Sequence, residues 1–104
     1  MKFWYFRFEG KFTEQSENCG DGVFSSCLVP ESNFRRAKTI FEGALPGKRI
    51  VLTEVIEYFS VDGEALDPTD EVNNFWITWY NKTKREGELS FEVFHVFALD
   101  SGRD

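Results

Sequence analysis

The stretch from residue 3 to residue 12 is the part of this sequence that most limits what the chain can fold into. Most of its residues are aromatic, and aromatic residues are typical of β-strands. Side chains alternate between the two faces of a strand, so Phe3 and Tyr5 lie on one face. The larger set of rings lies on the other: Trp4, Phe6, Phe8 and Phe12. The stretch therefore predicts a strand that turns its richer face toward a core.

Three further stretches have the composition of strands. A turn signal at Cys19–Gly22 precedes the first of them, and Asp62–Gly63 follows the second. The predicted strands are residues 23–29, residues 49–61 and residues 89–99. Apolar residues in 49–61 fall on both faces, which indicates a central strand or one whose second face is covered.

Two stretches have apolar residues at helical spacing. The first follows Ser32, a residue type that caps helices, and ends at Leu45–Gly47, where proline and glycine stop it. The second begins at Asp67 and ends at Gly87. The order β-β-α-β-α-β predicts a single α+β domain over residues 1–104, a four-stranded, mostly antiparallel sheet with two helices on one face. The predicted core is Trp4, Phe6, Phe34, Ile40, Phe41, Phe75, Trp76, Trp79, Phe91 and Val93.

The acidic balance of the chain limits its partners. It carries 18 Asp and Glu against 12 Lys and Arg, a formal net charge of −6. Nucleic-acid binders need basic surfaces that neutralise phosphates, so we expect no nucleic-acid partner, whereas a basic protein fits the charge. We see neither a signal peptide nor an apolar run long enough for a membrane span, so we expect a cytoplasmic protein without membrane contact. Cys19 and Cys27 are then expected as reduced thiols.

No set of residues has the spacing of a catalytic, cofactor or metal site. The single histidine, His95, is predicted on an apolar strand face, where a structural role outweighs a catalytic one. Glu54 and Glu57 are predicted on opposite faces of a regular strand, so they cannot act as one carboxylate pair. The sequence predicts no catalytic residue, no cofactor and no metal, and it favours a protein that is not an enzyme.

The surplus of aromatic residues favours binding instead. Apolar residues collect on the strand faces opposite the predicted core, with acids near them. The predicted partner-binding residues are Phe3, Tyr5, Glu9, Glu57, Glu92, Phe94 and Val96. Soluble monomers seldom leave such a patch unused. We therefore expect a non-enzymatic acidic protein that masks or inhibits a protein partner, as immunity proteins and small inhibitors do.

Three alternatives remain open from the sequence. The patch could be closed by a second copy of the chain in a homodimer. A dimeric α+β barrel that binds or converts a small molecule would hold His95 or Glu54 in a closed pocket. A structural component of a phage-type assembly would need no such pocket. A flat acidic surface would favour the binding protein over the barrel.

Overall fold

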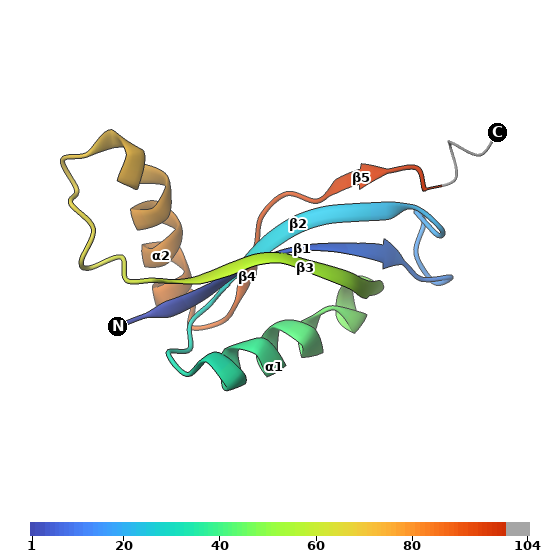
Figure 1. The fold of residues 1–104 in the computed structure, drawn as a ribbon, viewed down its shortest axis with the longest axis horizontal. Coiled ribbons are helices and arrows are strands. Elements are labelled where there is room, and N and C mark those ends of the chain that lie inside the picture. The colour runs from blue at the N-terminus through green and yellow to red at the C-terminus, as the bar shows by residue number, and fades with distance from the viewer. Residues whose placement is uncertain (100–104) are drawn as a thin grey trace.

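The structure, a computed structural model, describes residues 1–99. It contains a sheet of five antiparallel strands and two α-helices (Figure 1). The elements in chain order are β1 (Phe3–Phe12), β2 (Gly22–Val29), α1 (Phe34–Ala44), β3 (Ile50–Val61), α2 (Asn74–Glu86), β4 (Ser90–Phe91) and β5 (His95–Phe97). Short 3-10 helices, Pro46–Lys48 and Glu71–Asn73, precede β3 and α2. The predicted class and order of elements are confirmed, and the last predicted strand is divided in two.

β1 lies inside the sheet, whereas β3 lies at an edge. The strand order is β3-β1-β2-β4, and β5 pairs with β2. β1 is suited to the interior because its rings provide buried apolar side chains on both faces. The central position predicted for residues 49–61 is therefore wrong.

Two β-bulges explain why β3 has apolar residues at both odd and even positions although it is not a central strand. Thr53 and Ile56 have no register partner in β1, so each is an extra residue in β3. An extra residue reverses the alternation of side chains along the rest of the strand. Apolar residues of both parities therefore reach the same face of the sheet: Ile50, Leu52, Val55 and Tyr58.

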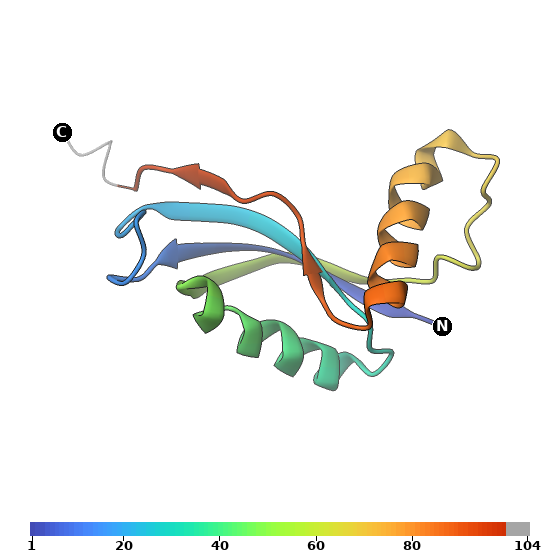
Figure 2. The same ribbon diagram turned by 180° about the vertical axis from the view of Figure 1, so that it is seen from behind.

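The two helices pack on opposite faces of the sheet, whereas the sequence placed them on one (Figures 1 and 2). α1 covers the face that carries Phe6 and Phe8. α2 covers the face that carries Phe3 and Tyr5. The separation follows from β1 itself, because rings on both sides of one strand need cover on both sides of the sheet.

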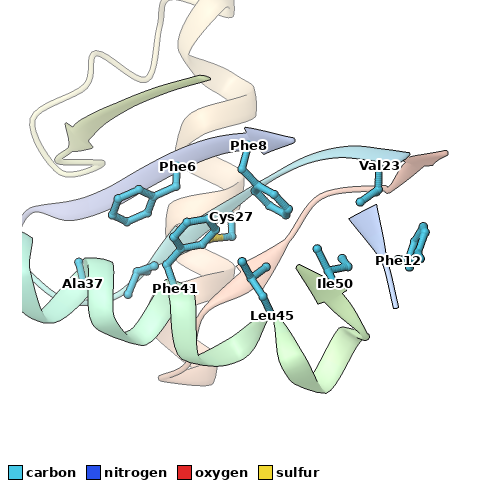
Figure 3. Packing of buried hydrophobic residues seen from close by; sticks show 10 residues of the cluster. Phe6, Phe8, Phe12, Val23, Cys27, Ala37, Phe41, Leu45 and Ile50 are labelled. Carbon is cyan, nitrogen blue, oxygen red and sulfur yellow. The ribbon is translucent and has the colours of Figure 1, made fainter. Parts of the chain in front are cut away.

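The core beneath α1 is built from stacked rings (Figure 3). The rings of Phe6 and Phe41 lie 4.7 Å apart at 3° between their planes, and Phe8 meets Phe41 edge-on at 5.2 Å. Burying a ring of this size contributes roughly 1.5–3 kcal/mol. Three predicted core residues are buried, namely Phe6, Phe41 and Trp79, and three are exposed, namely Ile40, Phe75 and Val93.

The core beneath α2 contains a chain of hydrogen bonds. The indole Nε1 of Trp79 donates to Ser90 Oγ at 2.6 Å, and the Thr83 hydroxyl donates to the Trp79 carbonyl at 2.8 Å. The ring of Tyr80 lies against Gly63, where an added Cβ would overlap the ring. Gly63 is therefore required by the close approach of α2.

Both helices begin later than predicted. α1 is capped by Asn33, whose side chain accepts from the backbone N–H of Arg36 at 3.0 Å, and not by Ser32. Asp67 and Asp70 each accept from the backbone N–H two residues later, at 2.9 and 3.0 Å. These bonds hold two successive turns ahead of α2, because aspartate caps turns as readily as helices.

Candidate binding surface

α2 crosses its face of the sheet near the start of β1 and leaves the rest of that face uncovered (Figures 1 and 2). The uncovered part begins beside Tyr5, which is 8% exposed against α2. The strand registers place one set of side chains beyond it on the same face. We call this surface the open face, and its residues are Arg7, Glu9, Lys11, Phe24, Val51, Glu54, Glu57, His95 and Phe97.

The bulge at Ile56 brings two carboxylates onto the open face. Glu57 pairs with Arg7, and Glu54 pairs with Glu9. Arg7 and Glu9 are two residues apart in β1, so they share a face and their partners share it too. The predicted placement of Glu54 and Glu57 on opposite faces is wrong, because it assumed a regular strand. The Nη1 atom of Arg7 lies 3.6 Å from Oε1 of Glu57.

Glu9 and Glu54 form an uncompensated acidic pair. They are register partners on neighbouring strands, so their side chains project next to each other. Neither has an ion pair within residues 1–99. Like charges directly opposite each other destabilise a sheet. A cation that approached the pair would remove this repulsion.

A small polar pocket of about 190 Å³ lies at the inner end of the open face. Its lining is Tyr5, Arg7, Phe24, Ser25, Ser26, Glu92, Val93 and His95. Ser26 Oγ donates to Glu92 Oε1 at 2.5 Å, and the backbone N–H of Glu92 donates to the Ser26 carbonyl at 2.8 Å. Desolvation by burial raises the pKa of Tyr5 above 10.0, so its phenol stays neutral near pH 7. Glu54 lies outside this lining.

An extra residue in the last strand turns His95 toward the open face. Phe91 pairs with Cys27, and His95 pairs with Phe24, so three residues of the last strand lie opposite two residues of β2. The alternation of side chains reverses across this break. His95 therefore leaves the face that the sequence predicted it to share with Phe91.

The predicted partner-binding residues separate into two groups. On or beside the open face lie Tyr5, Glu9, Glu57 and Glu92. Phe3 is 1% exposed beneath α2, so its predicted exposure is wrong, and so is that of Tyr5. Phe94 packs against the core beneath α1, and Val96 pairs with Val23 of that core and is 45% exposed. The predicted apolar patch therefore does not form, because α2 and the break in the last strand divide its members between the two faces.

The aromatic part of the open face was not predicted from the sequence. The rings of Phe24 and Phe97 stack with their centroids 4.8 Å apart. The ring of Phe97 lies on Gly22, where an added Cβ would overlap it. A glycine within a strand marks such a close approach, so Gly22 was a usable signal. Arg7 and Lys11 were also detectable, because they share the parity of Tyr5.

An apolar groove of about 520 Å³ adjoins the polar pocket, between α2 and the segment after β4. Its lining is Asn74, Phe75, Thr78, Trp79, Lys82, Phe91, Glu92 and Val93. Phe75 and Val93 are 51% and 73% exposed on its walls. Glu92 and Val93 line both hollows, so the groove and the pocket are neighbours at the sheet edge opposite β3.

No known protein family, curated protein or solved structure matches this chain. Within the described residues, no three His, Cys, Asp or Glu side chains come together as ligands of a metal ion would. None of the helices between residues 1 and 99 has the length and apolar character of a membrane span. Cys19 is an exposed free thiol and Cys27 a buried one. What the chain does is therefore inferred from the open face and the hollows beside it.

Proposed function

We propose that this chain is a non-enzymatic binding protein that masks a basic protein partner through the open face. The observation that carries the proposal is the pair of Glu9 and Glu54, register partners that have no ion pair within residues 1–99. A Lys or Arg of the partner would lie between the two carboxylates and relieve their repulsion. The net charge of −6 adds long-range attraction toward a basic surface.

The dimensions of the polar pocket argue against a small-molecule site built around His95. Its volume of about 190 Å³ is below the roughly 300–1,000 Å³ typical of small-molecule sites. Glu92, a carboxylate that lines the pocket with His95, is engaged by the Ser26 hydroxyl. A small-molecule barrel built around His95 or Glu54 has correspondingly less support, and no observation supports an assembly component.

Capture of partners from the cells that make this protein tests the proposal. The wild-type chain is compared with a Glu9→Gln/Glu54→Gln variant and with a Glu86→Gln/Glu88→Gln control, which removes the same charge at the end of α2. We expect a basic partner that the wild type and the control retain, that the open-face variant loses, and that high salt releases. Equal retention by all three proteins would contradict the proposal.

A further inference from the structure

The outer edge of β3 is the longest unpaired strand edge in the described part of the chain. β3 spans Ile50–Val61 and pairs with β1 on one side only. Along its other side no strand of residues 1–99 pairs with it. Edge strands present rows of backbone N–H and C=O groups that can accept a further strand, and natural proteins blunt them with bulges and charges.

The bulges that hinder pairing with a further strand lie only in the first half of this edge. The bulges lie at Thr53 and Ile56, and the register with β1 is regular over Glu57–Val61. Within this regular segment Tyr58 and Phe59 point to opposite faces of the sheet. They are 55% and 37% exposed. A strand added at Glu57–Val61 would therefore meet an exposed ring on each of its faces.

Both rings are held in place by other aromatic side chains. Tyr58 lies 5.1 Å from Phe34 of α1 between ring centroids. Phe59 stacks on Tyr5 at 4.6 Å and meets Trp76 of α2 edge-on at 5.5 Å. Side chains that are already ordered lose little entropy when a partner packs on them. The edge is therefore prepared on both faces before anything binds.

We propose that Glu57–Val61 accepts an extended segment of the partner as an added strand. This inference rests on the proposed function and names the form in which the basic partner is bound. The charges give the added strand a definite pattern, because Glu54, Glu57 and Phe59 lie toward the open face whereas Tyr58 lies toward α1. Basic residues of the partner lie on the side of Glu57 and of Glu54, which stands just before the bulge at Ile56, and its apolar residues pack on Tyr58. The occupant is thus a strand in which basic and apolar residues alternate.

A second copy of this chain fits the edge poorly. Antiparallel pairing of two copies centred on Phe59 would place Glu54 of each chain opposite Glu64 of the other, and Glu64 already pairs with Lys84 and with the N-terminal amine. Each copy carries a net charge of −6. Two chains of the same charge repel each other, so the net charge favours a basic strand over a second copy at this edge.

A short synthetic peptide in which Lys and Val alternate is the probe for this edge, with a Glu–Val peptide as its matched control. We expect the wild-type chain to bind the Lys peptide and to protect those β3 amides that point away from β1 from hydrogen exchange. Glu54→Lys should weaken binding of the Lys peptide about tenfold and allow binding of the Glu peptide. Glu54 is exposed, so this variant leaves the core intact.

The outcomes separate strand addition from the proposed function. Strand addition is supported if the Lys peptide protects the β3 amides of the wild type and if Glu54→Lys binds the Glu peptide in preference to the Lys peptide. Strand addition is overturned if the Lys peptide protects amides at the groove beside Phe75 instead of those of β3. It is also overturned if the Lys peptide does not bind while capture of the partner still depends on Glu9 and Glu54. Either result leaves the proposed function standing. If light scattering instead shows a dimer whose β3 amides are protected before any peptide is added, a second copy is the occupant of the edge, and addition of a partner strand is overturned. Loss of both peptide binding and capture overturns both proposals.

Discussion

The two faces of this sheet differ in how completely a helix closes them. α1 runs along the strands, and its core extends from Phe6 to Phe12 and Ile50 (Figures 1 and 2). α2 stands across the strands at one end, and its core reaches only from Phe3 to Tyr5 in β1. The two helices have similar lengths, but α1 covers its face of the sheet, whereas α2 leaves about half of the other face exposed to water. The direction of a helix relative to the strands decides where this protein has a surface free for binding.

The largest expected effect is at the centre of the closed face. Phe41→Ala should lower the free energy of unfolding by about 3–5 kcal/mol, because it removes a fully buried ring that stacks on Phe6 and leaves a cavity. Denaturant titration measures the loss. The neighbouring Ile40→Ala is the control, and at 40% exposure it should cost about 1 kcal/mol or less. Equal losses would mean that α1 does not close this face in the way described.

The core beneath α2 should depend on the hydrogen bond between Trp79 and Ser90. Trp79→Ala should cost about 3–5 kcal/mol through lost packing. Trp79→Phe keeps most of the packing and should cost about 1–3 kcal/mol, because the hydrogen bond to Ser90 is lost. Trp76→Phe is the control, since the Trp76 indole donates no hydrogen bond among residues 1–99 and the residue is only half-buried in the same core. Similar losses for Trp79→Phe and Trp76→Phe would contradict a stabilising role of the hydrogen bond to Ser90.

Raising the pH should lower the free energy of unfolding through the two cores in different pH ranges. Burial raises the pKa of the Cys27 thiol beneath α1 far above its ordinary 9.0, and burial raises the pKa of Tyr5 and Tyr80 beneath α2 above 10.0. Each group stays protonated in the folded chain and ionises first in the unfolded chain. The stabilisation is therefore complete below the ordinary pKa and falls as pH rises above it, by up to about 1.4 kcal/mol per pH unit for the thiol.

Unfolding of the wild type and of Cys27→Ala from pH 8 to about pH 11 separates these contributions. The fall in stability that begins near pH 9 should be absent from the variant, and the fall above pH 10 should remain. If both proteins lose stability with the same slope, the thiol is not buried as the structure places it.

The smallest expected effect has the opposite sign. Glu54→Gln should stabilise the chain by about 0.2–1 kcal/mol, because it removes the like charge opposite Glu9. Glu57→Gln removes the same charge from the same strand but breaks the contact with Arg7, so it should cost up to about 1 kcal/mol. Denaturant titration at low salt measures both, and both effects should shrink at high salt. Destabilisation by Glu54→Gln would show that Glu54 has a compensating partner.

Local signals predicted the elements well. Alternating rings predicted β1, and Gly87 ends α2 with a φ of 73°, as expected of a terminal glycine. Periodicity indicates that a helix has an apolar side, but it does not say which face of a sheet will receive that side. Both helices were placed on one face for this reason, although Phe3 and Tyr5 already required cover on the other.

Single extra residues account for most of the errors in the candidate site. Glu54, Glu57, His95 and Phe94 were all assigned to faces by counting alternate positions. The bulges at Thr53 and Ile56 and the break before His95 each interrupt that count. A bulge residue needs no particular side chain in these positions, so composition gave no warning. Errors of register therefore accumulate at the binding surface, whereas the cores tolerate them because apolar residues occupy both parities.

The break in the last strand also bears on how such a chain can change over evolutionary time. Val93 is 73% exposed and lies in the segment where three residues oppose two. Loss of one codon there would leave two residues opposite two and restore a regular strand, while His95 would still pair with Phe24 and Phe97 with Gly22. The extra residue is therefore a place where the length of the chain can change by one without exchanging the residues that the last strand displays on the open face. A lineage that gains or loses this residue keeps the same set of contact residues, so a new partner has to be reached by substitutions in β5 itself.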